Sequence, residues 1–458
     1  MAHSLNDINH AFFIGIGGVS MSSLASILII KGKKVSGYDM NCSASTERLI
    51  REGAEISYDL SAEIPKDVDT IIYTAAVNND NPLMIKAYES GAVILSRAEL
   101  LGIVTNSFKT SVGVAGTHGK STTTGLLSSV CLTHDSETAV LSGANLPFIG
   151  SSYKCADGER IVYEACEYKN SYHSMIPSIK VILNCEHDHV DFFPNIEDVI
   201  DSFKKFIDEP RYKGSENIAV VNGDCSNSVL AARGTRAKVY TYSTEHDADF
   251  RAYDIDMSSG YGKFSVKLHD GKCIEGIQLL IPGIHNVSNS TAAAAAAYLS
   301  GVSSENIKKG LESFTGVSRR FEYLGTYNGA KIFDDYAHHP DELEVTLKAA
   351  RMLNHGRIIC VFQPHTYSRT YEMLDGFAKA LSLADKVYLC PIYPAREINT
   401  TGVASTDICA RMSNASCPGD FADIAEILKN DLSEGDYCIT MGAGEAFKTA
   451  RILLDSEE

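Results

Sequence analysis

The chain has 458 residues, of which 44% are hydrophobic and 22% charged, so it can build several cores and is not wholly disordered. Its 58 acidic and 41 basic residues give a net charge of −17, which argues against general binding to nucleic acid or to anionic membranes. No apolar run reaches the roughly 18 residues of a membrane span, residues 1–10 lack a signal-peptide pattern and the cysteines form no CxxC pair, so we expect a cytoplasmic protein with reduced thiols.

Short apolar strands alternate with helix-like segments along the first part of the chain. Strands are expected at residues 11–16, 35–38, 70–74 and 92–95, and helices at 19–32, 45–53 and 82–91. Such alternation is typical of βαβ units around a parallel sheet. Because the segment 106–110 is polar, we expect a first domain of residues 1–108.

The alternation resumes in two further blocks. Strands are expected at 111–115, 160–165, 180–184 and 218–222, and then at 331–334, 357–362, 386–389 and 437–440. Between residues 249 and 281, short strands separated by turns predict antiparallel hairpins added to the edge of the second sheet. With a boundary at 316–319, the remaining domains are expected at 109–316 and 317–458. The predicted fold is therefore three consecutive α/β domains.

A glycine-rich turn at Gly116–Thr124 follows an apolar strand and opens a helix. Its glycines let backbone N–H groups surround phosphate oxygens, and the helix N-terminus adds positive potential. Lys120 is expected to contact the β- and γ-phosphates of a nucleotide, and the Ser121 hydroxyl to reach Mg²⁺, so the central domain is predicted to be P-loop ATPase-like. The spacing is not the strict form, since Val114 replaces its first glycine. The alternative is an ordinary turn with a surface lysine.

A second glycine-rich turn, Gly15–Gly18, also joins a strand to a helix, as in a Rossmann-like domain. Ser20 stands where the dinucleotide fingerprint has Gly or Ala, and Asp39 ends the next strand, where an acidic residue can bind a ribose hydroxyl. A diphosphate needs only the turn and the helix end, so UDP fits as well as NAD. A tight turn without any ligand is the alternative.

Polar clusters end two further strands of the central block, at Glu164–Glu167 and Asn184–Asp191. Because the carboxyl ends of parallel strands share one edge of a sheet, we expect both clusters near the phosphate-binding turn. Oxygen ligands and an imidazole there suit a divalent cation on nucleotide phosphates. A zinc pair of His187 and His189 is disfavoured, since no third ligand has suitable spacing.

The third block has two similar clusters, Asp334–Pro340 and Gln363–Arg369, each after an expected strand. Both are expected at the carboxyl edge of the third sheet, where ligands usually bind. The pair Arg319–Arg320 lies at the domain boundary, where a solvated linker charge is the alternative to a binding role.

Taken in order, these motifs resemble those of the Mur ligase family over nearly the whole chain. The resemblance is carried by Gly15–Met21, Gly116–Thr124, Glu164–Glu167, Asn184–Asp191, His285–Ala293, Arg320, Phe333–Glu342, Phe362–Thr370 and Tyr393–Arg396. Within the family, the Asp-Asp-Tyr-Ala-His-His-Pro and Gln-Pro-His-Thr-Tyr-Ser-Arg-Thr segments are similar to those of the alanine-adding branch.

The resemblance implies an ATP-dependent amide ligase of peptidoglycan synthesis. Such an enzyme joins L-alanine to the lactyl carboxylate of UDP-N-acetylmuramate through an acyl phosphate, forming ADP and phosphate. Its three domains bind the UDP-sugar, ATP and the amino acid in that order. ATP and Mg²⁺ are the implied cofactors, with neither nucleic acid nor membrane insertion, and the enzyme is expected as a monomer or weak homodimer.

The resemblance also assigns roles to single residues. Residues implied at ATP are Gly116, Thr117, His118, Gly119, Lys120, Ser121, Thr122, Asn289 (adenine), Asp335 (ribose) and Arg320 (phosphates, when the third domain closes). Those implied at the UDP-sugar are Gly15, Gly17, Gly18 and Asp39. Those implied at the metal are Ser121, Glu164 and His189. Those implied in catalysis are Lys120, His189, Arg320, His338, His365 and Arg369, the last three near the amino acid.

Three departures and three other functions stay open. Ser121 replaces the more frequent Thr, His187 stands where relatives have a small residue, and Lys204 is expected as a solvated helical lysine rather than a carbamylated metal bridge. A related enzyme that attaches a recycled tripeptide would share most motifs. An NAD-dependent oxidoreductase would leave Gly116–Thr124 without a role, and a nucleotide-sensing scaffold would not need Glu164 and His189.

Overall fold

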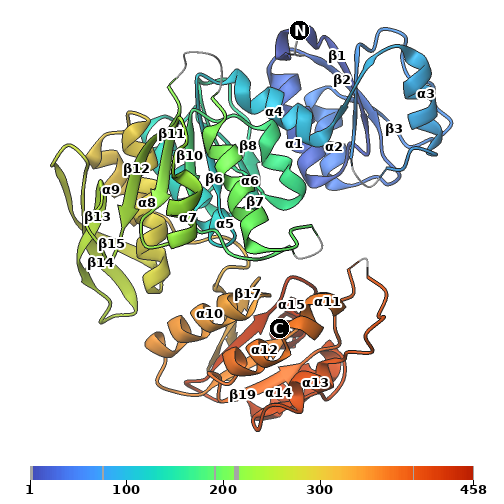
Figure 1. Cartoon of the computed structure of the whole chain (residues 1–458). Coiled ribbons are helices and arrows are strands. Elements are labelled where there is room, and N and C mark those ends of the chain that lie inside the picture. The colour runs from blue at the N-terminus through green and yellow to red at the C-terminus, as the bar shows by residue number, and fades with distance from the viewer. Residues whose placement is uncertain (1–3, 75–76, 190–191, 211–215, 396, 457–458) are drawn as a thin grey trace. The chain divides into compact units, whose positions relative to one another are not determined.

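The computed structural model describes residues 4–74, 77–189, 192–210, 216–395 and 397–456, so Asp191 of the predicted cation cluster and Arg396 of the family segments lie outside the described residues. The chain divides into two compact units, the first formed by Met1–Ala252, Val266–Ile274 and Asn289–Leu311, and the second by Tyr253–Ser265, Glu275–Ser288 and Glu312–Glu458. Three sheets follow one another along the chain (Figure 1). No helix in the described ranges is long and apolar enough to cross a bilayer.

The first sheet is parallel, as predicted, with strand order β3-β2-β1-β4-β5. Its strands are β1 (His10–Ile14), β2 (Lys34–Tyr38), β3 (Glu55–Ser57), β4 (Thr70–Tyr73) and β5 (Val93–Ser96), and its helices are α1 (Val19–Ile30), α2 (Ala44–Glu52), α3 (Pro82–Ser90) and α4 (Arg97–Ser107). Apolar residues of α1, α2 and α4 pack on one face and those of α3 on the other. This is the layering of a doubly wound fold.

The second sheet has ten strands in the order β15-β14-β13-β12-β11-β10-β6-β9-β7-β8. They are β6 (Thr110–Ala115), β7 (Ala139–Leu146), β8 (Ser151–Lys154), β9 (Arg160–Glu164), β10 (Ile179–Ile182), β11 (Ile218–Asn222), β12 (Lys238–Ser243), β13 (Phe250–Asp256), β14 (Tyr261–Lys267) and β15 (Cys273–Pro282). The helices are α5 (Lys120–His134), α6 (Ile196–Asp208), α7 (Ser226–Ala232), α8 (Ile284–Leu299) and α9 (Ser304–Glu312). Strands β13 to β15, joined by short turns, form the predicted addition at one edge.

The third sheet has the order β16-β17-β21-β18-β19-β20, and β16 is antiparallel to β17 whereas the other pairs are parallel. Its strands are β16 (Glu322–Tyr327), β17 (Ala330–Asp335), β18 (Ile358–Phe362), β19 (Lys386–Leu389), β20 (Ala415–Ser416) and β21 (Tyr437–Met441). Its helices are α10 (Pro340–Leu353), α11 (Tyr367–Glu372), α12 (Leu374–Leu381), α13 (Ser405–Cys409), α14 (Phe421–Asp431) and α15 (Phe447–Leu454). Helices α10, α12 and α13 cover one face and α14 and α15 the other.

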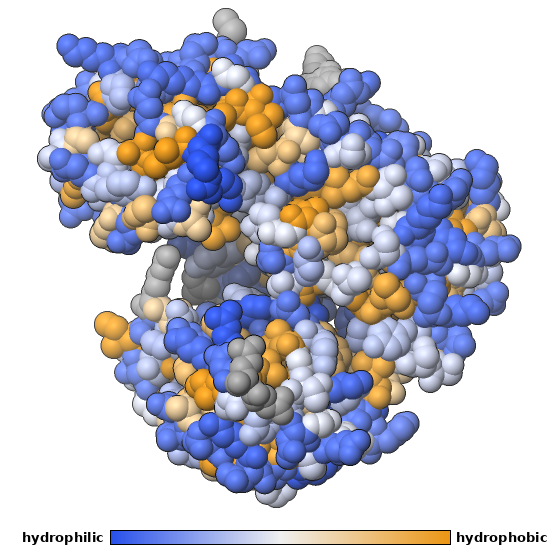
Figure 2. All heavy atoms as spheres, turned by 180° about the vertical axis from the view of Figure 1, so that it is seen from behind, coloured by the Kyte–Doolittle hydropathy of each residue, from blue (hydrophilic) through white to orange (hydrophobic). Residues whose placement is uncertain are grey.

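Several elements were not predicted from the sequence. Helix α4 fills most of the segment before the expected boundary, and strands β7, β8, β12 and β16 have no counterpart among the expected strands. After β18 the chain forms two successive helices, α11 and α12, because the backbone of Met373 leaves the helical region between them. On the face shown in Figure 2, hydrophilic residues predominate and hydrophobic ones form small scattered patches.

Candidate active site

The phosphate loop, Gly116–Lys120, connects the carboxyl end of β6 to α5. Gly116 and Gly119 have φ angles of 148° and 83°, a region that side chains rarely adopt. A Cβ on Gly116 would lie 2.8 Å from the Cβ of Leu183, and one on Gly119 would lie 2.9 Å from the Oδ1 of Asn289. Both positions therefore need glycine, and Asn289 of α8, to which the family resemblance assigns a contact with adenine, lies directly against the loop.

A neighbouring segment after β10 fixes the shape of this loop. The Asn184 side chain accepts a hydrogen bond from the His118 N–H at 2.7 Å and donates one to the His118 carbonyl at 3.1 Å. The Thr117 hydroxyl exchanges hydrogen bonds with the backbone of Glu186. Asn184 was in a predicted motif but had no predicted role, and the structure makes it a brace of the loop.

Lys120, the first residue of α5, forms a buried ion pair with Glu167. Its Nζ lies 3.0 Å from the Glu167 carboxylate and also donates to the Gly116 and Thr117 carbonyls. Burial alone would lower the pKa of Lys120, but the neighbouring negative groups, Glu167 first among them, together more than offset it, so the net shift is upward. Burial would likewise raise the pKa of Glu167, yet the Lys120 ammonium and the contact with His189 together make the net shift downward. Both groups are charged at neutral pH, and Glu167 belonged to a predicted cluster but had no predicted role of its own.

Ser121 and Glu164 meet at the start of α5. The Ser121 hydroxyl donates to Glu164 Oε2 at 2.8 Å, and the Gly143 N–H donates to the same oxygen at 3.0 Å. A Cβ on Gly143 would lie 2.8 Å from the Glu164 carboxylate, so β7 approaches this group as closely as glycine allows. A hydroxyl and a carboxylate together are the hard oxygen donors that Mg²⁺ takes.

His189 lies beside Glu167 rather than beside Ser121 and Glu164. Its Nε2 is 3.4 Å from the Glu167 carboxylate, and its ring is 4.7 Å from that of Tyr168. The ring of His187 instead bonds the Phe193 carbonyl at 2.9 Å, which is a structural contact. No group of three or more His, Cys, Asp or Glu side chains gathers as a metal site within the described ranges.

The backbone around Glu167 is strained. Lys169 and Asn170, in the 3₁₀ segment Tyr168–Ser174, have φ angles of 53° and 56°, and His189 has 55°. Left-handed backbone costs a side-chain-bearing residue about 1–2 kcal/mol. The Asn170 side chain accepts a 2.5 Å hydrogen bond from Ser202 of α6, which helps to hold this strained arch. Lys204, also on α6, is exposed, as predicted for a solvated lysine.

The turn after β1 has a different construction. Gly15 has a φ of 85°, and the Gly17 N–H donates to Asp39 Oδ2 at 2.7 Å. Gly18 is the N-cap of α1, whose first turn has neither a capping side chain nor an acidic residue. The Asp39 carboxylate therefore holds the turn, and the start of α1 is left open to an anion.

In the second unit, Arg319, Arg320 and Asp335 lie at the carboxyl end of β17. Arg319 forms an ion pair with Asp334 at 2.9 Å, whereas Arg320 lies 3.6 Å from Glu342. Both oxygens of Asp335 accept backbone N–H bonds, from Phe321 at 2.8 Å and Ala337 at 2.7 Å. Burial raises the pKa of Asp335 to about 6 although Arg320 and these N–H groups oppose the shift.

The predicted His338, His365 and Arg369 come together at the same edge. The rings of His338 and His365 are 5.9 Å apart, and Arg369 is near enough to influence the pKa of His338. Burial lowers the pKa of His338 to about 4, with the carboxylate of Glu342 opposing that shift. Glu342 also accepts a bond from the His338 N–H at 3.0 Å. Glu342 thus connects Arg320 to His338, a link that the spacing of the motifs did not reveal.

Known proteins resemble the chain from end to end. Models of the Mur ligase family catalytic domain, the Mur ligase middle domain and the Mur ligase glutamate ligase domain match residues 10–109, 114–297 and 319–444. A UDP-N-acetylmuramate–L-alanine ligase of Lachnospira eligens is 42% identical over 98% of this chain and 98% of its own length. The chain belongs to the Mur ligase family.

Other relatives of this Mur ligase share its sequence or its fold. A UDP-N-acetylmuramate–L-alanine ligase of Acetivibrio thermocellus is 42% identical over 99% of the chain and 97% of its own length. The crystal structure of the UDP-N-acetylmuramate–alanine ligase of Thermotoga maritima matches with a TM-score of 0.78 and 25% identity, covering 98% of this chain and 99% of that one. A murein peptide ligase of Psychrobacter arcticus shares the fold, with a TM-score of 0.69 and 23% identity over 98% of each chain.

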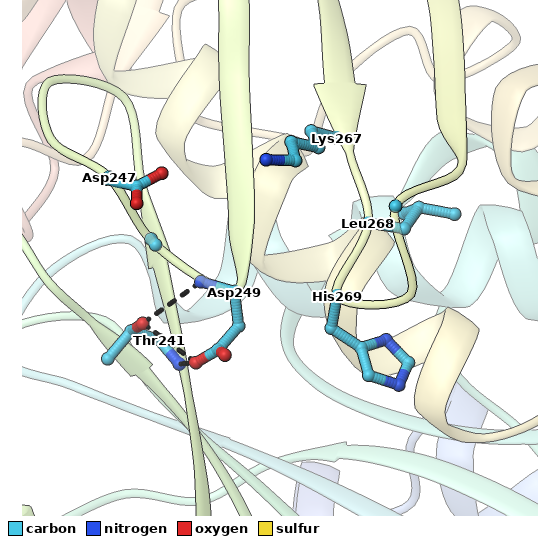
Figure 3. A pocket seen from close by; sticks show the side chains of 8 residues that line it. Thr241, Asp247, Asp249, Lys267, Leu268 and His269 are labelled. Carbon is cyan, nitrogen blue, oxygen red and sulfur yellow. Dashed lines mark hydrogen bonds between the residues drawn. The ribbon is translucent and has the colours of Figure 1, made fainter.

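A polar cavity of the Mur ligase, apart from the predicted site residues, lies on the added strands. Figure 3 shows Asp247, Asp249, Lys267 and His269 around it, between the β12–β13 connection and the end of β14. Asp249 is engaged by the N–H and hydroxyl of Thr241, at 2.8 and 3.0 Å. We assign no function to this cavity.

Proposed function

We propose that this Mur ligase joins L-alanine to the lactyl carboxylate of UDP-N-acetylmuramate, with ATP converted to ADP and phosphate. The observation that carries the proposal is the phosphate loop with Lys120, Ser121 and Glu164 gathered at one edge of the second sheet. The two 42% identical relatives that match almost the whole chain bear this enzyme's name. The earlier assignment of a UDP-sugar domain, an ATP domain and an amino-acid domain is part of the proposal, as is a cytoplasmic location.

The first half of the reaction makes the carboxylate reactive. A carboxylate oxygen of the substrate attacks the γ-phosphorus of ATP, the bond to the β-phosphate oxygen breaks and ADP leaves. Two anions must approach each other, so positive charge is needed where they meet. Lys120 supplies that charge, and Glu167 fixes the position of its ammonium before nucleotide binds. The loop N–H groups and the start of α5 bind the phosphates.

Ser121 and Glu164 are suited to hold Mg²⁺, since a hydroxyl and a carboxylate already lie 2.8 Å apart beside the loop. When bound there, the ion would neutralise phosphate charge. His189 is a proposed ligand of a second ion on the strength of the family resemblance, and in this structure its ring contacts Glu167 instead.

The second half of the reaction forms the amide. The alanine amine, once it has lost a proton, attacks the acyl carbon, and the bond from that carbon to the phosphate oxygen breaks. We assign the amino acid to the edge of the third sheet that bears His338, His365 and Arg369. A neutral His338 does not repel the ammonium of alanine, and Arg369 offers a cation for its carboxylate.

A substrate matrix tests the proposal. Phosphate release is measured with UDP-N-acetylmuramate or UDP-N-acetylglucosamine against L-alanine, L-serine, glycine and a muropeptide-type tripeptide. We expect release only with UDP-N-acetylmuramate, and fastest with L-alanine. Release with the tripeptide but not with alanine would favour the recycling ligase, and tight NADH binding without ATP hydrolysis would favour an oxidoreductase.

A further inference from the structure

A cavity of about 320 Å³ in the first unit lies beside both nucleotide-binding turns. One wall comes from α1 and the start of α4, with Ser20 and Arg97, and the other comes from β7 and the end of β9, with Gly143 and Glu164. The cavity therefore extends from the open start of α1 to the carboxylate beside the phosphate loop. Among the described residues that line it, only Arg97 and Glu164 carry a formal charge.

Arg97 has few partners within the protein, although a half-buried cation is normally paired. It is half-buried, and its Nη1 donates to the Ser20 hydroxyl at 3.1 Å. No carboxylate of the described residues pairs with it, whereas Glu164 is already engaged by Ser121 and Gly143. A guanidinium has five N–H donors, and buried charges are normally paired. The donors that Ser20 does not use are available to a ligand in the cavity.

The position of Arg97 favours an anion for a second reason. Ser20 belongs to the first turn of α1, where no side chain caps the helix and the helix itself has no acidic residue; the nearby Asp39 carboxylate is engaged by the Gly17 N–H. The positive end of the α1 dipole and the guanidinium of Arg97 therefore lie side by side, within one hydrogen bond of each other. An oxyanion placed between them gains from both.

We infer that Arg97 binds an anionic group of the sugar nucleotide and so fixes the substrate between the Gly15–Gly18 turn and Glu164. This inference rests on the proposed function. UDP-N-acetylmuramate carries two such groups, the diphosphate and the lactyl carboxylate, and the planar fork of arginine fits either with two parallel hydrogen bonds. If the carboxylate is the partner, Arg97 also offsets its repulsion by Glu164.

Binding measurements on the full chain test this role without ATP. Arg97→Met and Arg97→Lys are compared with the wild type by calorimetry, using UDP-N-acetylmuramate and UDP-N-acetylglucosamine, which has the same diphosphate but no lactyl group. Arg51→Met, the same change at an exposed position of α2, is the matched control. We expect Arg97→Met to bind UDP-N-acetylmuramate about 10- to 100-fold more weakly, as for other charge-assisted contacts. Arg97→Lys should recover part of that loss, because it keeps the charge and not the fork.

The two nucleotides separate the two sources of the anion. Weaker binding of both assigns Arg97 to the diphosphate, and weaker binding of UDP-N-acetylmuramate alone assigns it to the lactyl carboxylate. The inference is overturned if the wild type binds the nucleotides and both Arg97→Lys and a folded Arg97→Met bind each nucleotide as tightly as the wild type does. A wild type that binds neither nucleotide overturns the proposed function itself. In turnover, the KM for UDP-N-acetylmuramate should rise while the KM for ATP stays constant, a split that general misfolding would not give.

Discussion

The phosphate loop of the first unit and the histidine-rich edge of the second, formed by Asp335–His339 and His365–Arg369, are both built at the carboxyl ends of parallel strands. They hold buried charge differently. Lys120 and Glu167 are paired, and pairing shifts each pKa toward the charged form. Asp335 is contacted by backbone N–H groups and His338 lies 3.3 Å from the Glu342 carboxylate, but there burial outweighs these contacts and shifts each pKa toward the neutral form.

This difference teaches that depth of burial does not by itself set protonation. Each of these groups loses water, and the charged state is favoured only where the surrounding charges and hydrogen bonds together outweigh that loss, as they do for Lys120 and Glu167 but not for Asp335 and His338. The site proposed to bind a triphosphate keeps Lys120 charged. The site assigned to alanine, a zwitterion, keeps the imidazole of His338 neutral. The following predictions test the two halves of this comparison, from the largest expected effect to the smallest.

Lys120→Ala removes the cation of the charged site. We expect ATP turnover to fall by roughly 1,000-fold, since a preorganised charge at the transferring phosphoryl group is lost. UDP-sugar binding should be retained. Stability should also fall, by about 3–5 kcal/mol, because Glu167 loses its ammonium partner and keeps only His189 beside its buried charge.

The double variant Lys120→Ala/Glu167→Gln separates these two effects. It should regain most of the stability in chemical denaturation and none of the turnover in an ADP assay. Near-normal turnover of Lys120→Ala would remove Lys120 from the proposed chemistry.

Asp335→Asn removes a buried carboxyl whose pKa is raised to about 6. The folded wild type keeps its proton up to about pH 6, whereas the unfolded chain releases it near the ordinary value of 3.8, so rising pH between these values destabilises the wild type. That cost reaches about 3 kcal/mol at pH 7. Between pH 4 and pH 7, the denaturation midpoint should therefore fall less for the variant than for the wild type. An equal decrease in both proteins would contradict the raised pKa of Asp335.

His338→Gln tests the opposite slope. The unfolded chain takes up a proton near pH 6.5 but the folded chain only near pH 4, so stability is full above 6.5 and is lost as the pH falls toward 4. At pH 4.5 the loss attributable to this group is about 2.5 kcal/mol. Wild type and variant are compared by thermal unfolding at pH 7.0 and 4.5, with the exposed His355→Gln as control. The variant should lose less stability than either.

Glu164→Gln weakens a proposed metal ligand without changing its shape. We expect the Mg²⁺ concentration for half-maximal turnover to rise roughly tenfold or more. Glu159→Gln, at the other end of β9 and exposed, is the matched control. An unchanged Mg²⁺ requirement for Glu164→Gln would exclude Glu164 as a ligand.

Much of the fold follows from period and composition, because strands β1, β6 and β18 are short apolar runs and their helices begin at recognisable turns. Helix α4 was missed because its apolar residues do not keep to one face, and β7 because Ser142, Gly143 and Asn145 interrupt its apolar run. Among site residues, Lys120 and Glu164 could be found from spacing to a strand end. The Lys120–Glu167 and Arg320–Glu342 contacts could not, since they join distant segments through side-chain directions that one sequence does not specify.

The two consecutive left-handed residues, Lys169 and Asn170, have a consequence for protein engineering. Glycine at either position would relieve strain, while giving the unfolded chain more freedom. A search for thermostable variants that selects for folding alone would accept a glycine wherever the strain relieved in the folded state exceeds the entropy gained by the unfolded chain. It would then loosen the segment that aims Glu167 at Lys120, so screens of this enzyme should score turnover alongside heat resistance.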